Sequence, residues 1–152
     1  MTAPRFLADE MLGRLARYLR MVGCDTTYVR GWPDDAIVAR AREEGRILLT
    51  RDRALAARTP AAILLTGVDL PDQLRQLVHA LPQVPREVAF VRCTLCNGDL
   101  LPVPADPDRP PRPERAGTPV FACASCGHRY WEGSHTSDVR RHLAAWIPGT
   151  AE

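Results

Sequence analysis

Two pairs of cysteines constrain the fold of this chain more than any other feature. Cys93 and Cys96 are separated by two residues, and Cys123 and Cys126 repeat the same spacing. A two-residue spacing lets a tight turn point both sulfurs of a pair inward, and two such turns complete a tetrahedral thiolate site. We therefore expect these four cysteines to bind a structural Zn²⁺ in a zinc ribbon, with no ligand position left for a catalytic water.

The fifth cysteine, Cys24, leaves an odd number of thiols. An odd number fits a disulfide framework poorly and fits a reducing compartment, where thiols bind metal. We expect Cys24 to be a small buried hydrophobic residue. The N-terminus lacks a basic stretch before a long apolar run, and no window reaches the roughly 18 apolar residues of a membrane helix. These features predict a cytoplasmic protein with no membrane partner.

The overall charge does not by itself indicate a nucleic-acid partner, because the formal net charge is only +2. All 20 basic residues are arginine. Planar guanidinium groups suit phosphate recognition, but a composition bias of the source genome is the better explanation for the absence of lysine. The position of each arginine therefore matters more than their number.

Strands and helices are expected to alternate over the first 80 or so residues. Short apolar or β-branched runs predict the strands, and apolar residues at helical spacing predict the helices. The expected strands are residues 5–8, 26–29, 46–50 and 61–66, and the expected helices are residues 12–22, 34–44 and 70–81. This alternation predicts an α/β domain, with a mainly parallel central sheet covered by helices on both faces.

A different pattern begins near Pro82, and we place a domain boundary at about residue 85. The predicted domains are residues 1–85 and a zinc-ribbon domain of residues 86–152. Residues 102–119 contain seven of the 14 prolines and predict a loop or mobile insert. In the second domain we also expect a strand at 87–91, a hairpin from 120–122 and 129–131, and a short terminal helix at 139–146.

Several aspartates are expected at the edge of the sheet where parallel strands end and ligands commonly bind. Asp9 follows the first expected strand, Asp52 follows the third, and Asp34 and Asp35 begin the second helix. Clustered carboxylates are costly without a cation, and hard oxygen ligands favour Mg²⁺ or Mn²⁺. We therefore predict a divalent-metal site that includes Asp9 and Asp52.

A structural role is the alternative for each aspartate. Asp34 is well placed as a helix N-cap or first-turn acid, and Asp9 and Asp52 can cap the helices that follow them. The sequence leaves both interpretations open. Other candidates for an outer or fourth acidic position are Glu10, Asp35, Asp69 and Asp72.

Candidate RNA-binding residues lie near both predicted sites. Arg14 and Arg17 fall opposite the leucine face of the first helix and Arg20 flanks it, which suits either a phosphate backbone or an ordinary solvated face. Arg51 lies beside Asp52 with the same two interpretations. His135 ends a short turn after the last cysteine, where it can contact nucleic acid or form a hydrogen bond within the protein.

Four motifs occur in an order that resembles one family. Residues 6–20, residues 45–52, the four cysteines and residues 130–135 together resemble the Mut-seven C-terminal ribonuclease family. The resemblance covers nearly the whole chain. It implies a PIN-like, three-layer nuclease domain followed by a zinc ribbon.

The resemblance also implies an activity and a set of residues. Asp9, Asp34 and Asp52 match the family's acidic positions, with Asp35 as an alternative to Asp34. PIN-like nucleases usually use a fourth acidic residue, which we cannot assign between Asp69 and Asp72. The predicted function is a metal-dependent ribonuclease that uses Mg²⁺ or Mn²⁺, with a zinc ribbon that aids RNA or partner binding. The alternative is a catalytically inactive adaptor that binds RNA or protein.

Overall fold

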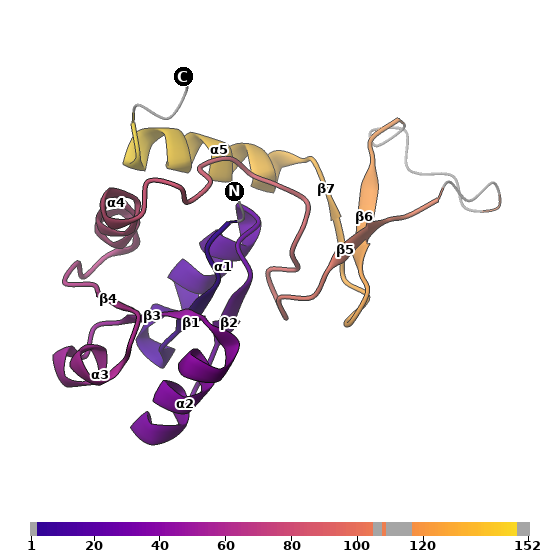
Figure 1. Ribbon diagram of the computed structural model, residues 1–152. Coiled ribbons are helices and arrows are strands. Elements are labelled where there is room, and N and C mark those ends of the chain that lie inside the picture. The colour runs from indigo at the N-terminus through magenta and orange to yellow at the C-terminus, as the bar shows by residue number, and fades with distance from the viewer. Residues whose placement is uncertain (1–2, 105–107, 109–116, 149–152) are drawn as a thin grey trace.

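The computed structural model describes residues 3–104, 108 and 117–148. Over this part, the chain forms a four-stranded parallel sheet with helices, and a separate three-stranded antiparallel sheet beside the cysteines (Figure 1). The predicted α/β fold followed by a zinc ribbon is confirmed. Residues 105–107 and 109–116 of the predicted proline-rich insert lie outside the described residues.

The parallel sheet has the strand order β2-β1-β3-β4. Its strands are β1 (Phe6–Ala8), β2 (Thr26–Tyr28), β3 (Ile47–Thr50) and β4 (Ala62–Leu64). The connecting helices are α1 (Gly13–Met21), α2 (Asp34–Glu44) and α3 (Arg53–Arg58), followed by α4 (Leu70–Ala80), and a 3-10 turn (Glu10–Leu12) precedes α1. All four predicted strands and the three predicted helices of this region are therefore present.

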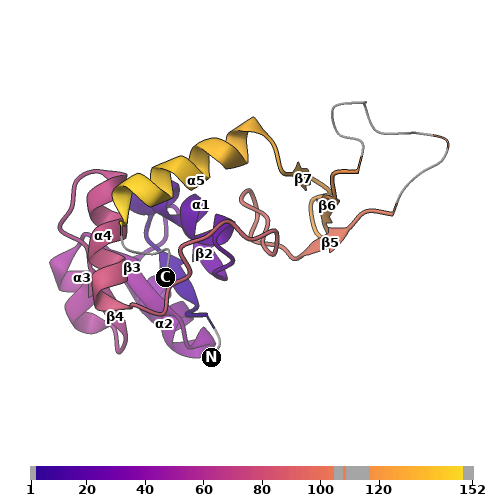
Figure 2. The same cartoon turned by 90° about the horizontal axis from the view of Figure 1, so that it is seen from above.

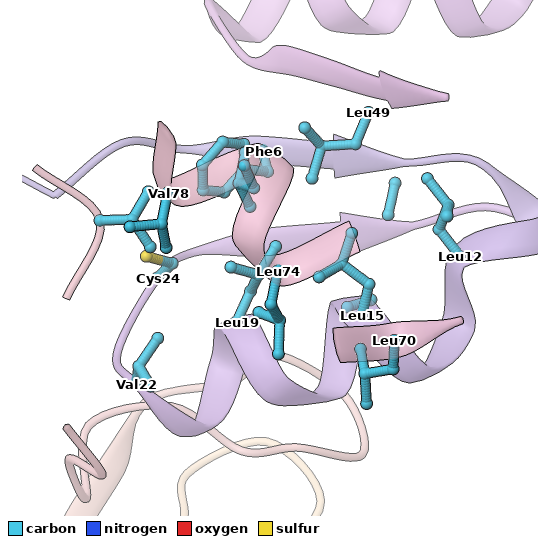
Figure 3. Packing of buried hydrophobic residues seen from close by; sticks show 14 of the residues in the cluster. Phe6, Leu12, Leu15, Leu19, Val22, Cys24, Leu49, Leu70, Leu74 and Val78 are labelled. Atoms are coloured by element: carbon cyan, nitrogen blue, oxygen red, sulfur yellow. The ribbon is translucent and has the colours of Figure 1, made fainter. Parts of the chain in front are cut away.

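The central strand β1 is buried on both faces. Its side chains alternate, so Phe6 and Ala8 belong to one core and Leu7 belongs to the other. Residues of α1 and α4 pack with Phe6, as Figure 3 shows for Leu19 and Leu74, whereas residues of α2 and α3 pack with Leu7. Helices therefore cover both faces of the sheet and give a three-layer architecture.

The C-terminal helix returns to the α/β layers. Helix α5 (Ser134–Trp146) begins five residues before the predicted helix, because the Thr136 hydroxyl bonds the backbone N–H and C=O of Gly133. Val139, Leu143 and Ile147 are buried in the same core as α1 and α4. Figures 1 and 2 show α5 running from the ribbon back to α4. The division of the chain near residue 85 stays a prediction.

The antiparallel sheet consists of β5 (Leu100–Pro102), β6 (Val120–Cys123) and β7 (Arg129–Trp131). The predicted hairpin is confirmed, and β5 is an additional strand. The predicted strand at 87–91 is wrong. The Ala89 backbone N–H donates to the carbonyl oxygen of Met21 at the end of α1, so this segment packs across the helix end.

The first cysteine pair is attached to the edge strand β2. The Thr26 backbone N–H donates to Asn97 Oδ1 (2.9 Å), and Asn97 Nδ2 donates to Asp25 Oδ1 (2.7 Å). Arg20 is 7% exposed and donates from Nε to the Thr26 carbonyl and from a terminal nitrogen to the Thr94 carbonyl. These bonds cover backbone groups that an edge strand would otherwise expose.

Asp25 carries the strongest charge interaction at this junction. Its carboxylate accepts a 2.8 Å hydrogen bond from Arg46, whose side chain is 8% exposed. Burial alone would raise the pKa of Asp25, but the hydrogen bonds from Arg46 and Asn97 and the charges of Arg46 and Arg92 lower it to about 2. Ionised Asp25 therefore stabilises the folded chain at neutral pH.

Asp25→Asn is expected to remove a pH-dependent part of the stability. Because folding lowers the Asp25 pKa from 3.8 to about 2, the wild type should lose about 2 kcal/mol from this group as pH falls from about 5 to about 1. The variant should show a flatter dependence in that window and should be about 2 kcal/mol less stable at neutral pH. Urea unfolding at a series of pH values measures both differences.

Asp99→Asn is the matched control, since Asp99 is an exposed carboxylate that pairs with Arg92. Its effect should stay below about 1 kcal/mol at neutral pH. An Asp25→Asn variant whose pH profile parallels the wild type would contradict the assigned role of Asp25.

Candidate functional site

The four cysteines of the two pairs come together in one cluster. Their sulfur atoms all lie within 4.8 Å of one another. Cys93 Sγ is 3.6 Å from Cys126 Sγ, and Cys96 Sγ is 3.4 Å from Cys123 Sγ. Within the described part of the chain, this is the one group of three or more cysteine, histidine or acidic side chains with such a spacing. The cluster is therefore a candidate metal site.

The local backbone explains how each pair points inward. The residue after each pair, Asn97 or Gly127, has a left-handed backbone, with φ of 71° and 79° respectively. A Cβ at Gly98 would lie 2.7 Å from Cys123 Sγ, so the two turns approach too closely for a side chain there. Backbone N–H groups of Ser125 and Cys126 donate to the Cys123 sulfur. The backbone of both turns therefore directs the sulfurs toward one another.

The electrostatics of the cluster fit a cation. Burial opposes ionisation of Cys123, but backbone hydrogen bonds from Cys126 and Ser125 lower its pKa to about 6. The Gly98 N–H favours ionised Cys96, but burial and the neighbouring sulfurs raise the pKa of Cys96 to about 12. Four thiolates so close together repel one another unless a divalent cation neutralises them. Four sulfur donors match a closed structural zinc site.

Cys24 lies outside this cluster. It is fully buried in the core, and burial first, then the charge of Asp25, raises its thiol pKa to about 12. The prediction that Cys24 is a small buried hydrophobic residue is confirmed.

Asp9 and Asp52 lie at the carboxyl edge of the parallel sheet. Asp9 follows β1, from which the chain continues to α1, and Asp52 follows β3, from which it continues to α3. Helices α1 and α3 cover opposite faces of the sheet. The connections from two adjacent strands therefore diverge here, and in open α/β sheets such a switch point is where ligands bind.

The buried hydroxyl of Thr50 links the two aspartates. Thr50 Oγ1 donates to Asp9 Oδ2 (2.9 Å) and accepts from the Asp52 backbone N–H (3.0 Å), and Thr50 is 0% exposed. The other Asp9 oxygen accepts from the Glu10 N–H, and Asp52 Oδ1 accepts from the Leu55 N–H. Both aspartates therefore also act as helix caps. Sequence reasoning missed Thr50, whose one indication was a polar residue ending an apolar strand.

Asp34 and Asp35 are exposed in the first turn of α2, after the N-cap residue Pro33. The Asp35 carboxylate forms an ion pair with Arg58 of α3. Among the described residues, Asp34 does not form a three-ligand group with Asp9 and Asp52 at the spacing seen for the cysteines. Asp34 is thus a first-turn acid here, in agreement with the structural alternative.

The two candidates for a fourth acidic position differ in their surroundings. Asp69 caps α4 by accepting from the Asp72 N–H, and it lines a surface hollow of about 400 Å³ together with Glu10. The Asp72 carboxylate is paired with Arg75. Asp69 is therefore the candidate that faces a space next to the Asp9 strand end.

The predicted RNA-binding arginines differ in how far they are buried. Arg14 and Arg17 are exposed on α1. Arg20 is instead buried in the junction with the first cysteine pair, so its expected exposure is wrong: its guanidinium bonds backbone carbonyls of Thr26 and Thr94. Arg51 is half-buried, and within the described residues its Nε has no hydrogen-bond partner.

His135 lies at a cavity between the ribbon and the start of α5. The cavity has a volume of about 310 Å³, and its aromatic lining includes Phe90, Tyr130 and Trp131. The Tyr130 hydroxyl lies 3.0 Å from Cys93 Sγ, which ties this wall to the cysteine cluster. The cavity therefore combines aromatic surface with a polar imidazole.

Comparison with known proteins identifies one family. The sequence model of the Mut7-C RNAse domain matches residues 4–143, which include the parallel sheet and the cysteine cluster. A search of curated proteins and a search of solved structures each find no match. Among the described residues, there is no helix with the length and apolar character needed to cross a membrane.

Metal removal is expected to loosen β2 as well as the ribbon. Chelating zinc from the loaded protein frees the first cysteine pair, and with it the Asn97 oxygen that accepts from the Thr26 N–H. We expect a lower melting temperature and hydrogen exchange at the Thr26 amide that is at least about tenfold faster, since this amide loses its acceptor. The Leu48 amide, bonded to Ala61 inside the sheet, is the internal control and should change less. Unchanged melting and exchange after verified zinc removal would contradict a structural metal.

Proposed function

The chain belongs to the Mut7-C RNase domain family, and from this premise we propose that it is a metal-dependent ribonuclease. It would hydrolyse RNA phosphodiester bonds at a Mg²⁺ or Mn²⁺ site that includes Asp9 and Asp52. The observation that supports this most is the Thr50 hydrogen-bond link between these two residues at the switch point of the sheet.

The donors present suit such an ion. Mg²⁺ is commonly held by one or two carboxylates, substrate phosphates and water, and not by a complete protein cage. Asp9 and Asp52 would supply the carboxylates, and Asp34, which does not form a three-ligand group with them, would act by orienting a water. When bound, the ion would activate a water and neutralise charge on the phosphate undergoing in-line displacement.

The chain's own contacts prepare these carboxylates. Thr50 fixes the Asp9 side chain through Oδ2, and the Leu55 N–H fixes Asp52 through Oδ1. Because both side chains are already oriented, little conformational freedom is lost when substrate binds. We assign Thr50 as a positioning residue that acts through Asp9.

The ribbon would have a separate task. Its four thiolates would hold a structural Zn²⁺ with no open coordination position. We propose that the ribbon aids RNA binding through the cavity beside His135, where Phe90 and Trp131 offer aromatic surface for bases. Arg14, Arg17 and Arg51 would contact the RNA backbone near the sheet.

One observation favours the alternative of an inactive adaptor. Asp9, Asp52 and Asp69 each accept a backbone N–H at the start of a helix, and this role requires no metal. In that case the chain would bind RNA or protein without cleaving RNA.

Asp9→Asn and Asp52→Asn are expected to reduce cleavage of labelled RNA by about 100-fold or more, since each removes a charged ligand that would hold the ion. The assay uses zinc-loaded full-length chain with added Mn²⁺ or Mg²⁺. Asp99→Asn, which changes an exposed carboxylate in the ribbon, is the control and should cleave like the wild type. Equal cleavage by the wild type and both variants would refute the site, and RNA binding without cleavage by the wild type would favour the adaptor.

Thr50→Val is expected to lower the cleavage rate by about 10- to 100-fold and to raise the Mn²⁺ concentration for half-maximal activity. Valine has a similar shape but leaves Asp9 Oδ2 without its donor and the Asp52 N–H without its acceptor. Thr50→Ser keeps the hydroxyl and should restore both readouts. A loss of stability with an unchanged metal requirement would mean that Thr50 is only structural.

A further inference from the structure

Two neighbouring hollows lie on the surface of α1 and β2. The first, of about 400 Å³, includes Glu10 and Asp69, and the second, of about 310 Å³, includes Arg17 and Leu95. Four residues line both hollows, so the two lie side by side on one extended surface: Gly13, Arg14, Tyr28 and Arg30. We call this the arginine groove, after Arg14, Arg17 and Arg30. It runs from the Asp9 strand end to the first cysteine pair.

The arginines of the groove are available to an anion. Arg14, Arg17 and Arg30 are exposed, and within the described part of the chain they form no ion pair or hydrogen bond through their side chains. Among the other arginines that the structure describes, eight form ion pairs with Asp or Glu. Three uncompensated guanidinium groups along one hollow give it a positive potential that attracts phosphates.

The floor of the groove is fixed by Tyr28. The Tyr28 hydroxyl donates to the Glu10 carbonyl (2.6 Å), and a Cβ on Gly13 would lie 3.2 Å from the Tyr28 oxygen. The absence of a side chain at Gly13 therefore lets the Tyr28 ring pack against the start of α1. The groove is held by the sheet and helix and not by a loop alone.

Exposed apolar side chains lie at both ends of the groove. Met11 is 65% exposed at the sheet-edge end, and Leu95 is 56% exposed at the cysteine end. Cationic groups between two apolar ends suit a strand whose bases are unpaired, because its phosphates and base faces are both accessible. In a duplex the base faces are stacked inside and cannot reach such side chains.

We propose that the arginine groove binds the backbone of single-stranded RNA between the first cysteine pair and the carboxylate site. This inference deepens the proposed function and rests on it. The phosphates contact Arg14, Arg17 and Arg30, and unpaired bases contact Leu95 and Met11 at the two ends.

The two ends of the groove differ in charge. Glu10 and Asp69 line the sheet-edge end, where they repel phosphate, whereas the part beside Arg17 and Leu95 contains no acidic lining residue. Binding at the arginines therefore does not require Mg²⁺ or Mn²⁺. RNA affinity can be measured without either ion and separately from cleavage.

The experiment measures binding of a short labelled oligouridine by fluorescence anisotropy, using zinc-loaded full-length chain without added Mg²⁺ or Mn²⁺. The triple variant Arg14→Gln, Arg17→Gln and Arg30→Gln should bind at least about tenfold more weakly than the wild type. Because each phosphate contact on a single strand contributes about 0.7 to the slope of log affinity against log salt, the slope should fall by about 2. Arg42→Gln, which changes an exposed, unpaired arginine of α2 outside the groove, is the matched control and should bind like the wild type.

A second pair of variants tests the contacts with bases. Met11→Ser and Leu95→Ser together should weaken oligouridine binding several-fold and leave binding of inorganic polyphosphate unchanged. The inference is overturned if the wild type does not bind oligouridine, if the arginine triple variant keeps the wild-type affinity and salt slope, or if duplex RNA or polyphosphate binds as tightly as oligouridine.

These outcomes are separable from those of the proposed function. Weaker binding by the triple variant, with no cleavage by the wild type under any metal condition, would support the groove and refute the nuclease. If cleavage depends on Asp9 and Asp52 but RNA binding does not depend on the three arginines, the nuclease is supported and the groove is refuted. Circular dichroism and zinc content should match the wild type in all variants, since the three arginines form no ion pair or side-chain hydrogen bond within the described residues.

Discussion

The carboxylate of Asp25 joins the starts of the central strands to the first cysteine pair. Arg46, at the start of β3, donates to this carboxylate and to the backbone carbonyls of Phe6 and Asp25. Asn97 donates to the same carboxylate from the ribbon side. The partly buried charge of Asp25 is tolerated because it is paired and hydrogen-bonded. The amino edge of the sheet is thus occupied by structural contacts, and the opposite, carboxyl edge remains available for chemistry.

Arginine side chains serve different purposes according to their burial. Arg20 and Arg46 are buried, and each donates hydrogen bonds to groups from separate segments of the chain. The planar guanidinium is suited to this because it presents several donors in fixed directions. Arg14 and Arg17, on the same helix as Arg20, lack such partners and face solvent. One helix therefore both attaches the ribbon and offers cations to the groove.

The fold could be predicted from the sequence more fully than the contacts between the parallel-sheet region and the ribbon could. Alternating strands and helices are local patterns, so the parallel sheet could be predicted from periodicity and turn residues. Residues 87–91 also resemble a strand, but their backbone bonds the end of α1, a partner that lies far away in the sequence. The burial of Arg20 was missed for the same reason, since helical periodicity cannot show that Thr94 lies beside it. Asp9 and Asp52 were identifiable from strand ends, whereas the Thr50 link depends on the register of β1 and β3.

The two candidate metal sites need different ligands and lie in different parts of the fold. Four soft sulfurs form a closed cluster in the ribbon, whereas the hard oxygens of Asp9 and Asp52 lie at an open edge beside the centre of the sheet. The first cysteine pair contacts the edge strand β2 and the preceding Asp25, and Leu95 of that pair lines the far end of the arginine groove. Displacing this pair would therefore alter the groove directly, while the Asp9 and Asp52 link stays held between β1 and β3. Zinc would accordingly support substrate binding more than the geometry of the carboxylates.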